Sequence, residues 1–250
     1  GARQYIDLLH RNGVRVMLKP QLWIWRGVFT GELEMQSEED WKQLEAEYAD
    51  FILSFAELAE ETQAALFCIG TELESFVMAR PEFWDNLISE VRARYSGRIT
   101  YAANWDEYGR FPLWSRLDLI GIDAYFPLSE ARDPGVQELR TGWQRWKEDI
   151  RALHEAVEKP VLFTEYGYRS MDYTAKKPWL VEHVVGTEGE HHGNGLGDIN
   201  GDGRDEILVG IGKSGTDNIF CLDPERSVLF IQSQIKEHAE LLLILSMCSS

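Results

Sequence analysis

The chain has 250 residues, of which 44% are apolar and 12% aromatic, and its formal charge is −17. This apolar content can bury the core of one α/β barrel, or of one medium domain with a small one beside it. The charge argues against a nucleic-acid partner, because phosphates are neutralised by clustered Lys and Arg. The three scattered cysteines are too few for a disulfide framework or a zinc site. The apolar run Leu241–Leu245 is far shorter than the ~20 residues that cross a membrane, so we expect no membrane insertion.

Residues 1 to about 180 alternate between amphipathic helical stretches and short apolar runs, which is typical of strand–helix units around a parallel sheet. The predicted strands, in chain order, are Val14–Leu18, Ala65–Ile69, Ile99–Ala103, Leu117–Asp123 and Pro160–Thr164. Between them lie three clear helices: one that begins at Ser37, one with apolar positions from Trp84 to Tyr95, and one from Trp143 to Val157. These units predict a (β/α)8 barrel or a doubly wound sheet. In both folds the active site lies at the carboxyl ends of the strands.

Two glutamates stand at the ends of two of these strands. Glu72 follows the second strand, and Glu165 follows the fifth. A carboxylate is costly in a buried strand, and a pair of carboxylates is what glycoside hydrolysis requires. A retaining glycosidase holds a proton-donating carboxylic acid ~5 to 5.5 Å from a carboxylate that attacks the anomeric carbon. Two strand ends of one barrel can supply that spacing. The alternative is that both glutamates cap helices or pair with arginines on the barrel rim.

Aromatic and amide side chains also lie beyond the predicted strand ends. The candidate substrate-binding residues are Lys19, Trp23, Trp25, Asn104, Trp105 and Tyr125. Flat aromatic faces and amide groups suit the C–H faces and hydroxyls of sugars, so these residues predict a ligand cleft. Tyr125 either donates its hydroxyl to one of the carboxylates or is only a half-buried tyrosine. Trp143 and Trp146, at helical spacing, are expected to pack in the core.

Four motifs carry a family resemblance. They are Ile69–Glu74, Tyr101–Asp106, Ile120–Pro127 and Phe163–Tyr168. In this order they resemble glycoside hydrolase family 113 of clan A, a family of (β/α)8 barrels with retaining endo-β-1,4-mannanase activity, and the resemblance covers roughly residues 1 to 180. It implies that Glu72, after strand 4 of the barrel, is the acid/base and that Glu165, after strand 7, is the nucleophile. It also implies that Tyr125 lies near the nucleophile, that Asn104 and Trp105 line the cleft, and that catalysis needs no cofactor.

The sequence departs from the clan pattern in two ways. Thr71 stands where clan members usually have an Asn whose amide binds the sugar 2-hydroxyl, so the resemblance does not specify the exact sugar. The first predicted strand corresponds to strand 3 of the barrel, and strand 8 with its usual tryptophan is not recognisable after Glu165. We therefore expect a partial (β/α)8 barrel over residues 1–180, with strands 3 to 7 recognisable. Missing strands leave unpaired sheet edges.

Beyond residue 180 the composition changes to Gly, Asp, Asn and His, which predicts a boundary near residues 180 to 186 and a small β-rich C-terminal segment. Oxygen-bearing residues follow one another at the spacing that Ca²⁺ sites use. The predicted metal ligands are Asp198, Asn200, Asp202, Arg204 through its carbonyl, and Glu206. The loop and the following strand Ile207–Ile211 resemble an FG-GAP or VCBS repeat, to which we assign residues 186–235. A solvated turn is the alternative, and residues 236–250 stay unassigned.

Two functions follow from these features. The first is a retaining glycoside hydrolase that cleaves β-1,4-mannan or a related β-linked polysaccharide or oligosaccharide by double displacement with two glutamates. The alternative is a non-catalytic, calcium-stabilised carbohydrate-binding or adhesion fragment. We expect an extracellular or periplasmic location, although no signal peptide is visible in the sequence. No feature of the sequence specifies an oligomeric state.

Overall fold

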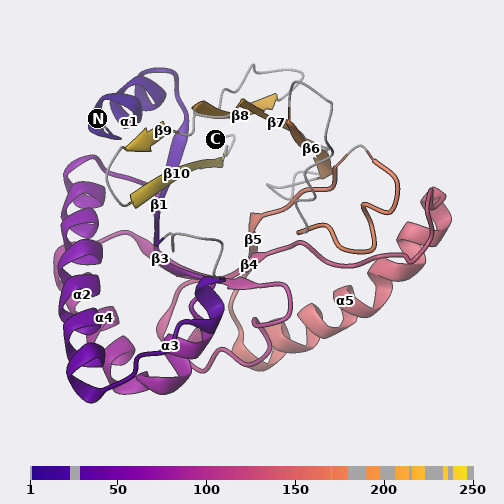
Figure 1. Cartoon of the computed structure of the whole chain (residues 1–250). Helices are drawn as coiled ribbons and strands as arrows, with labels where there is room; N and C mark the ends of the chain where they lie inside the picture. The colour runs from indigo at the N-terminus through magenta and orange to yellow at the C-terminus, as the bar shows by residue number, and fades with distance from the viewer. Residues whose placement is uncertain are drawn as a thin grey trace.

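The computed structural model describes residues 2–22, 29–169 and 171–179 with their side chains, and the backbone of the strands 190–197, 206–213, 216–222, 233–235 and 239–246. Five strands run parallel in one sheet, in the spatial order β5-β4-β3-β2-β1. They are β1 (Arg15–Leu22), β2 (Leu66–Thr71), β3 (Arg98–Asn104), β4 (Ile120–Asp123) and β5 (Val161–Glu165). The sheet curls like half of a barrel, with helices on its outer side (Figure 1). The predicted partial (β/α)8 barrel is confirmed.

One α-helix precedes β1, and α-helices fill three of the four connections between the parallel strands. They are α1 (Ala2–Arg11), α2 (Glu38–Glu61), α3 (Glu74–Ala79), α4 (Pro81–Arg94) and α5 (Val136–Val157), with short 3-10 turns η1 (Thr30–Glu32) and η2 (Trp114–Arg116). Helix α2 begins where the sequence predicts, because the Ser37 hydroxyl accepts the backbone N–H of Asp40 at 3.1 Å. Pro81 stands in the first turn of α4, where its missing N–H costs nothing. Only η2 lies between β3 and β4.

The two faces of the parallel sheet differ. Alternate side chains on the outer face, such as Val16, Phe67 and Ile122, pack against the helices in the main core. Burying a large apolar side chain of this kind stabilises the fold by about 1.5–3 kcal/mol. On the inner face, an apolar layer near the amino ends contains Met17, Leu66, Leu119 and Leu162. Charged and polar side chains replace it toward the carboxyl ends, so the inner face becomes polar where a (β/α)8 barrel has its active site.

Two strands contain one residue more than their neighbours near their carboxyl ends. Between β2 and β3, Cys68 pairs with Thr100 and the next pair is Thr71 with Ala102, so β2 has the extra residue. Between β4 and β5, Ile122 pairs with Phe163 and the next pair is Asp123 with Glu165, so β5 has the extra residue. An extra residue bends a strand and redirects the side chains that follow it. Strict alternation would place Glu165 on the face of Phe163, which packs against the outer core. The extra residue therefore directs Glu165 to the inner face.

On its other side, β1 pairs with an antiparallel strand, β10 (Ala239–Ser246), which in turn pairs with β9 (Ser233–Ile235). A (β/α)8 barrel contains only parallel strands, so this pairing is not part of that fold. A separate antiparallel sheet contains β6 (Glu190–Gly197), β7 (Glu206–Lys213) and β8 (Thr216–Leu222), with β7 in the centre. Strand β7 includes the predicted strand Ile207–Ile211.

The predicted calcium loop falls outside the described residues. The backbone of residues 198–205 is not described, and neither is the side chain of Glu206. The ligands Asp198, Asn200, Asp202 and Arg204 therefore stay a prediction. Among the residues that are described, no group of three or more His, Cys, Asp or Glu side chains could hold a metal ion. The described helices include none that is long and apolar enough to cross a membrane.

Candidate active site

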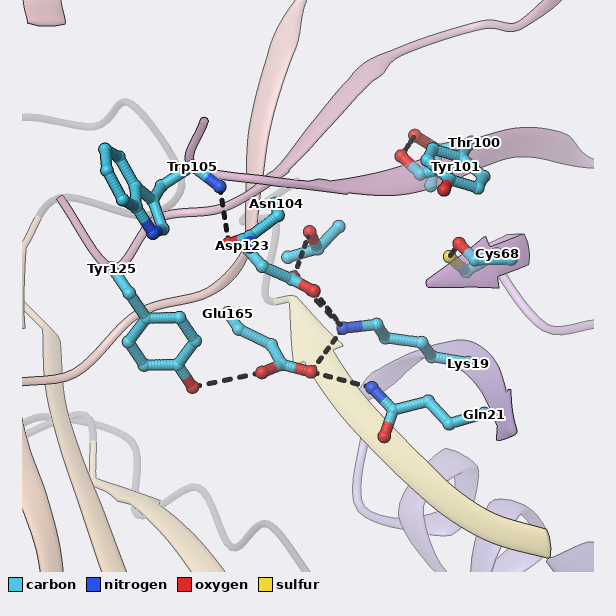
Figure 2. A network of polar contacts seen from close by, with 12 residues as sticks. Lys19, Gln21, Cys68, Thr100, Tyr101, Asn104, Trp105, Asp123, Tyr125 and Glu165 are labelled. Atoms are coloured by element: carbon cyan, nitrogen blue, oxygen red, sulfur yellow. Dashed lines mark hydrogen bonds and ion pairs between the residues drawn. The ribbon is translucent and has the colours of Figure 1, made fainter. Parts of the chain in front are cut away.

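A buried ion-pair network lies at the carboxyl ends of β1, β4 and β5 (Figure 2). The Lys19 ammonium of β1 donates to both carboxylate oxygens of Asp123, at 3.0 and 3.1 Å, and also pairs with Glu165. The Thr164 hydroxyl donates to Asp123 at 2.7 Å. Burial alone would lower the pKa of Lys19, but the charges of Asp123 and Glu165 outweigh it and raise the pKa. Lys19 is therefore a charged, fully buried group.

The Glu165 carboxylate accepts hydrogen bonds from three side chains. Lys19 and Gln21 both donate to Oε1, Gln21 at 2.9 Å, and the Tyr125 hydroxyl donates to Oε2 at 3.0 Å. Burial, followed by the charge of Glu165, raises the pKa of Tyr125 well above its usual value, so the hydroxyl keeps its proton and donates. These bonds orient both carboxylate oxygens. The side chain of Glu165 is 21% exposed, so it remains accessible from one direction.

Glu72 is held by its backbone. It follows β2 with a φ of +50°, in the left-handed region that residues other than glycine rarely adopt. Its N–H donates to the carbonyl of Ala102 in β3 at 2.8 Å. Burial, followed by the negative charges of Asp123 and Glu165, raises the pKa of the half-buried Glu72 carboxyl well above its usual value, although Lys19 acts in the opposite direction. The carboxyl therefore favours its protonated form.

The two glutamates belong to one site. The charge of Glu165 is among the largest causes of the raised pKa of Glu72, which places the two carboxyls within electrostatic reach of each other. Burial and negative charge raise the pKa of Glu72 and so favour its protonated form, and Glu165 is oriented by three donors. A protonated carboxylic acid beside an oriented carboxylate is the arrangement that glycoside hydrolysis uses.

Trp105 and Trp179 form a stacked aromatic pair next to this network. Their ring centroids are 4.9 Å apart with an interplanar angle of 18°, and Trp179 is 42% exposed. Trp146 meets Trp105 edge to face and donates its indole N–H to the carbonyl of Pro127 at 2.9 Å. At the end of β3, the Asn104 side-chain oxygen accepts the N–H of Trp105 at 2.8 Å, which orients the start of this loop. An exposed indole face of this kind suits a sugar ring.

The structure brings together Lys19, Glu72, Glu165 and Tyr125 of the predicted site, with Asn104 and Trp105 on the neighbouring strand end. Trp23 and Trp25 lie outside the described residues. The prediction that Lys19 begins a loop is wrong, because β1 continues to Leu22 and Lys19 is fully buried within it. Pro20 lies within β1, because its fixed φ is compatible with an extended strand. The role of each residue in catalysis or binding stays a prediction at this point.

Sequence reasoning missed Gln21, Asp123 and Thr164. Asp123 ends the predicted strand Leu117–Asp123, and a charged residue at a strand end is the same signal that identifies the two glutamates. Gln21 and Thr164 carry no comparable signal, because uncharged polar residues are common near strand ends. Their importance depends on pairing across strands that are far apart in the sequence.

Comparison with known proteins agrees with this geometry. The profile of Glycoside Hydrolase Family 113 matches residues 2–193. The β-mannanase AaManA of that family from Alicyclobacillus acidocaldarius, solved in complex with ManMIm, is 28% identical, with a TM-score of 0.63 over 73% of this chain and 56% of that chain. A complex of a family 113 β-1,4-mannanase is 25% identical, with a TM-score of 0.62 over 72% of this chain and 57% of that chain. The chain thus spans a little over half the length of these proteins. No protein with a curated description matches it.

Proposed function

Because the chain belongs to glycoside hydrolase family 113, we propose that it is a retaining glycoside hydrolase acting on β-1,4-mannan or a related β-linked polysaccharide. Glu165 is the nucleophile, and Glu72 is the acid/base. The observation that carries this proposal is the unlike environment of the two carboxyls: three side chains donate to Glu165, whereas burial and negative charge keep a proton on Glu72. A double displacement requires these two states at its start.

In the first step, a Glu165 oxygen attacks the anomeric carbon of the bound sugar while the bond to the leaving oxygen breaks. The Glu72 carboxylic acid gives its proton to that oxygen, so the leaving sugar departs as a neutral alcohol. The products are a glycosyl ester on Glu165 and an ionised Glu72. Gln21, Lys19 and Tyr125 hold the nucleophile in line during the attack.

In the second step, the Glu72 carboxylate accepts a proton from water, whose oxygen attacks the anomeric carbon and releases Glu165. Ester formation removes the charge of Glu165, which is one of the causes that raise the pKa of Glu72. The pKa of Glu72 therefore falls in the intermediate, where the residue must act as a base. One geometry thus supports both roles of Glu72 in turn.

The substrate class is supported by the solved relatives and by the aromatic pair. The similar structures are described as β-mannanases, one of them a β-1,4-mannanase complex. The stacked rings of Trp105 and Trp179 present a flat, partly exposed surface on which a sugar of a linear chain can lie. A polymeric substrate also agrees with an extracellular or periplasmic location, which we include in the proposal.

Hydrolysis of mannohexaose by the full chain tests the proposal. We expect product oligosaccharides with the wild type and none with Glu165→Ala. Glu130→Ala is the matched control, because it removes a carboxylate from an exposed ion pair with Lys176. Thermal melts would establish that all three proteins fold. A folded wild type without turnover would rule out the catalytic function.

The alternative function, a calcium-stabilised carbohydrate-binding fragment, is favoured by one observation. Strand β10 runs antiparallel beside β1, where a (β/α)8 barrel has a parallel strand. This alternative predicts that mannohexaose binds without being cleaved and that EDTA lowers the melting temperature. The calcium loop itself stays a prediction, and a melting temperature unchanged by EDTA would count against it.

A further inference from the structure

We infer that Tyr101 and Glu107 form a bracket that holds the acid/base Glu72 in its catalytic position and ties it to the Asn104 end of β3. The inference rests on the proposed function for the role of Glu72. The contacts that define the bracket are independent of that role. Both bracket residues are positioning residues, because they act through Glu72 and do not touch the substrate.

Glu72 needs such support because its backbone is strained. Its φ of +50° is unfavourable for a residue with a Cβ atom. A strained conformation of this kind persists only when the surrounding structure holds it, and it is found most often at functional sites. The groups that hold the peptides on either side of Glu72 therefore set the direction of its side chain.

Both of those peptides are bound to β3. The N–H of Glu72 donates to the carbonyl of Ala102 at 2.8 Å, and the N–H of Leu73 donates to the Tyr101 hydroxyl at 2.6 Å. The first bond is an ordinary backbone bond between neighbouring strands. The second depends on a side chain, so a substitution can remove it without changing the backbone.

Glu107 completes the bracket. The Tyr101 hydroxyl donates to Glu107 Oε1 at 2.7 Å, and Glu107 Oε2 accepts the N–H of Asn104 at 2.9 Å. The chain of hydrogen bonds thus runs from the peptide after Glu72 to the end of β3. Glu107 is only 2% exposed, so water cannot replace these bonds.

Aromatic packing fixes the position of the Tyr101 ring. It stacks on Phe111 at a centroid distance of 4.3 Å and meets Trp84 edge to face at 5.7 Å. The end of β2 approaches these rings at Gly70, where a Cβ atom would lie 2.8 Å from Trp84 and 3.0 Å from Tyr101. Glycine at this position lets the hydroxyl reach the peptide of Leu73.

The bracket requires a carboxylate at position 107. The Tyr101 hydroxyl has one proton, which it gives to Glu107 while it accepts the N–H of Leu73. Glu107 must therefore accept two hydrogen bonds, one on each oxygen. A glutamine has one acceptor oxygen and one amide donor, so it breaks either the bond from Tyr101 or the bond from Asn104.

Glu107 also acts on Glu72 through its charge. It is one of the groups that raise the pKa of Glu72, after burial, Asp123 and Glu165. Burial raises the pKa of Glu107 itself to about 7. The titratable and charged groups that face Glu107 are Glu72, Glu74, Tyr101, Arg110 and Asp123. Removing its charge must therefore shift the titration of Glu72 to lower pH.

The test compares Glu107→Gln, Tyr101→Phe and the control Glu60→Gln in the full chain. Glu60 also accepts a backbone N–H and a hydroxyl, both from Ser96, but it is exposed and its partner lies just before the amino end of β3, opposite to the carboxyl end that holds the site. We expect the two bracket variants to lower kcat by about 10- to 100-fold, with KM changed by less than about 3-fold. In Glu107→Gln the alkaline limb of kcat/KM moves to lower pH, whereas Tyr101→Phe retains the Glu107 carboxyl group and moves the limb less.

Wild-type kcat in both variants would overturn the inference, and so would an unshifted alkaline limb in a folded Glu107→Gln. Should Glu107→Gln fail to fold, Tyr101→Phe decides by its kcat, because it removes only one oxygen atom. Hydrogen exchange at the Leu73 amide is a readout that needs no activity. Faster exchange in both bracket variants supports the bracket even if the wild type proves inactive, which would reject only the proposed function. Unchanged exchange overturns the bracket.

Discussion

The ends of β5 and β2 each present a glutamate to the same site, but they hold it in different ways. Glu165 at the end of β5 is oriented by side chains, two from β1 and one from the segment after β4. Glu72 after β2 is oriented by its backbone, through a left-handed φ and N–H bonds to β3. Glu165 ends β5 and Glu72 follows β2, and each of these strands contains one extra residue relative to its neighbour.

The difference matches what the two steps require. A nucleophile must be ionised and aimed, so donors that bind its oxygens are useful. A general acid must keep its proton near neutral pH, so burial and nearby negative charges are useful, and strong donors to its oxygens would be harmful. The negative charge that raises the pKa of Glu72 is in part the charge of Glu165. The two environments therefore depend on each other.

The largest expected effect separates the two roles directly. We expect Glu165→Ala to lower the rate on mannohexaose by on the order of 10⁵-fold, since no covalent route remains. Glu72→Ala should cost about 10²- to 10⁴-fold. With a dinitrophenyl β-mannobioside and added azide, Glu72→Ala should give the β-mannosyl azide, because azide replaces water in the second step. Glu165→Ala should give the α-mannosyl azide, because azide replaces the nucleophile.

The configuration of the azide product, read by proton NMR, decides the assignment. The opposite pattern would exchange the roles of the two glutamates and contradict the comparison of their environments. Formation of no azide product by either variant, from a wild type that cleaves the substrate, would exclude both from covalent catalysis.

The next largest effect concerns the buried ion pairs at the end of β5. Lys19→Met leaves the carboxylates of Asp123 and Glu165 close together without their shared cation. Removing one partner of a buried pair costs about 3–5 kcal/mol, because the remaining charge is buried and uncompensated. We expect a loss of this size in the free energy of unfolding, measured by urea denaturation, and a loss of activity.

Lys176→Met is the control for this change. Lys176 pairs with the exposed Glu130, and water screens such a pair, so we expect its loss to leave the stability unchanged. Equal stability of Lys19→Met and the wild type would contradict the role of Lys19 as the cation that compensates the buried carboxylates at the end of β5.

The pH dependence of stability probes the β2 end. Burial raises the pKa of Glu107 from 4.5 to about 7, so between these values the folded protein binds more protons than the unfolded chain. The contribution of Glu107 to stability is therefore fully present below about pH 4.5 and is lost as pH rises through about 7. Relative to Glu107→Gln, the wild type should lose about 3 kcal/mol across this window.

For Glu60, the change of stability with pH has the opposite sign, and Glu60→Gln removes it. The backbone and side-chain hydrogen bonds from Ser96 lower the pKa of Glu60, so its contribution is present above its unfolded pKa and is lost as pH falls. Urea denaturation of the three proteins between about pH 3 and about pH 8 measures both slopes. A difference between wild type and Glu107→Gln that stays constant with pH would contradict the burial of an ionisable Glu107.

Much of the β5 and β2 ends could be predicted from the sequence. Glu72 and Glu165 interrupt apolar runs at positions where parallel strands end, and the helices between them carry clear 3.6-residue periodicity. These signals are local. They predict the parallel strand–helix units and the two carboxylates without knowledge of any contact, whereas the choice of a partial barrel depends on the family resemblance of the four motifs.

The groups that orient the glutamates could not be predicted in the same way. Gln21 and Glu165 are 144 positions apart in the sequence, and the register irregularity that directs Glu165 inward depends on the neighbouring strand. Glu107 lies three residues after Asn104 in a polar segment and has no local pattern that separates it from a surface residue. The sequence predicts Tyr101 within a strand, and only the structure shows its hydroxyl at the peptide after Glu72.

The smallest effect tests how much one donor contributes at the β5 end. Tyr125→Phe removes the hydrogen bond to Glu165 Oε2 and leaves the donors on Oε1 in place. A hydrogen bond to a charged group contributes about 1.5–3 kcal/mol, so we expect kcat/KM on mannohexaose to fall by about 10- to 100-fold. Tyr168→Phe is the matched control, because its hydroxyl donates to the carbonyl of Phe126 at 2.6 Å and not to Glu165. It should lower stability but leave kcat/KM close to that of the wild type. Equal losses of kcat/KM in both variants would mean that Tyr125 acts through packing and not through its hydrogen bond to Glu165. Side-chain donors would then not be what distinguishes the β5 end from the β2 end.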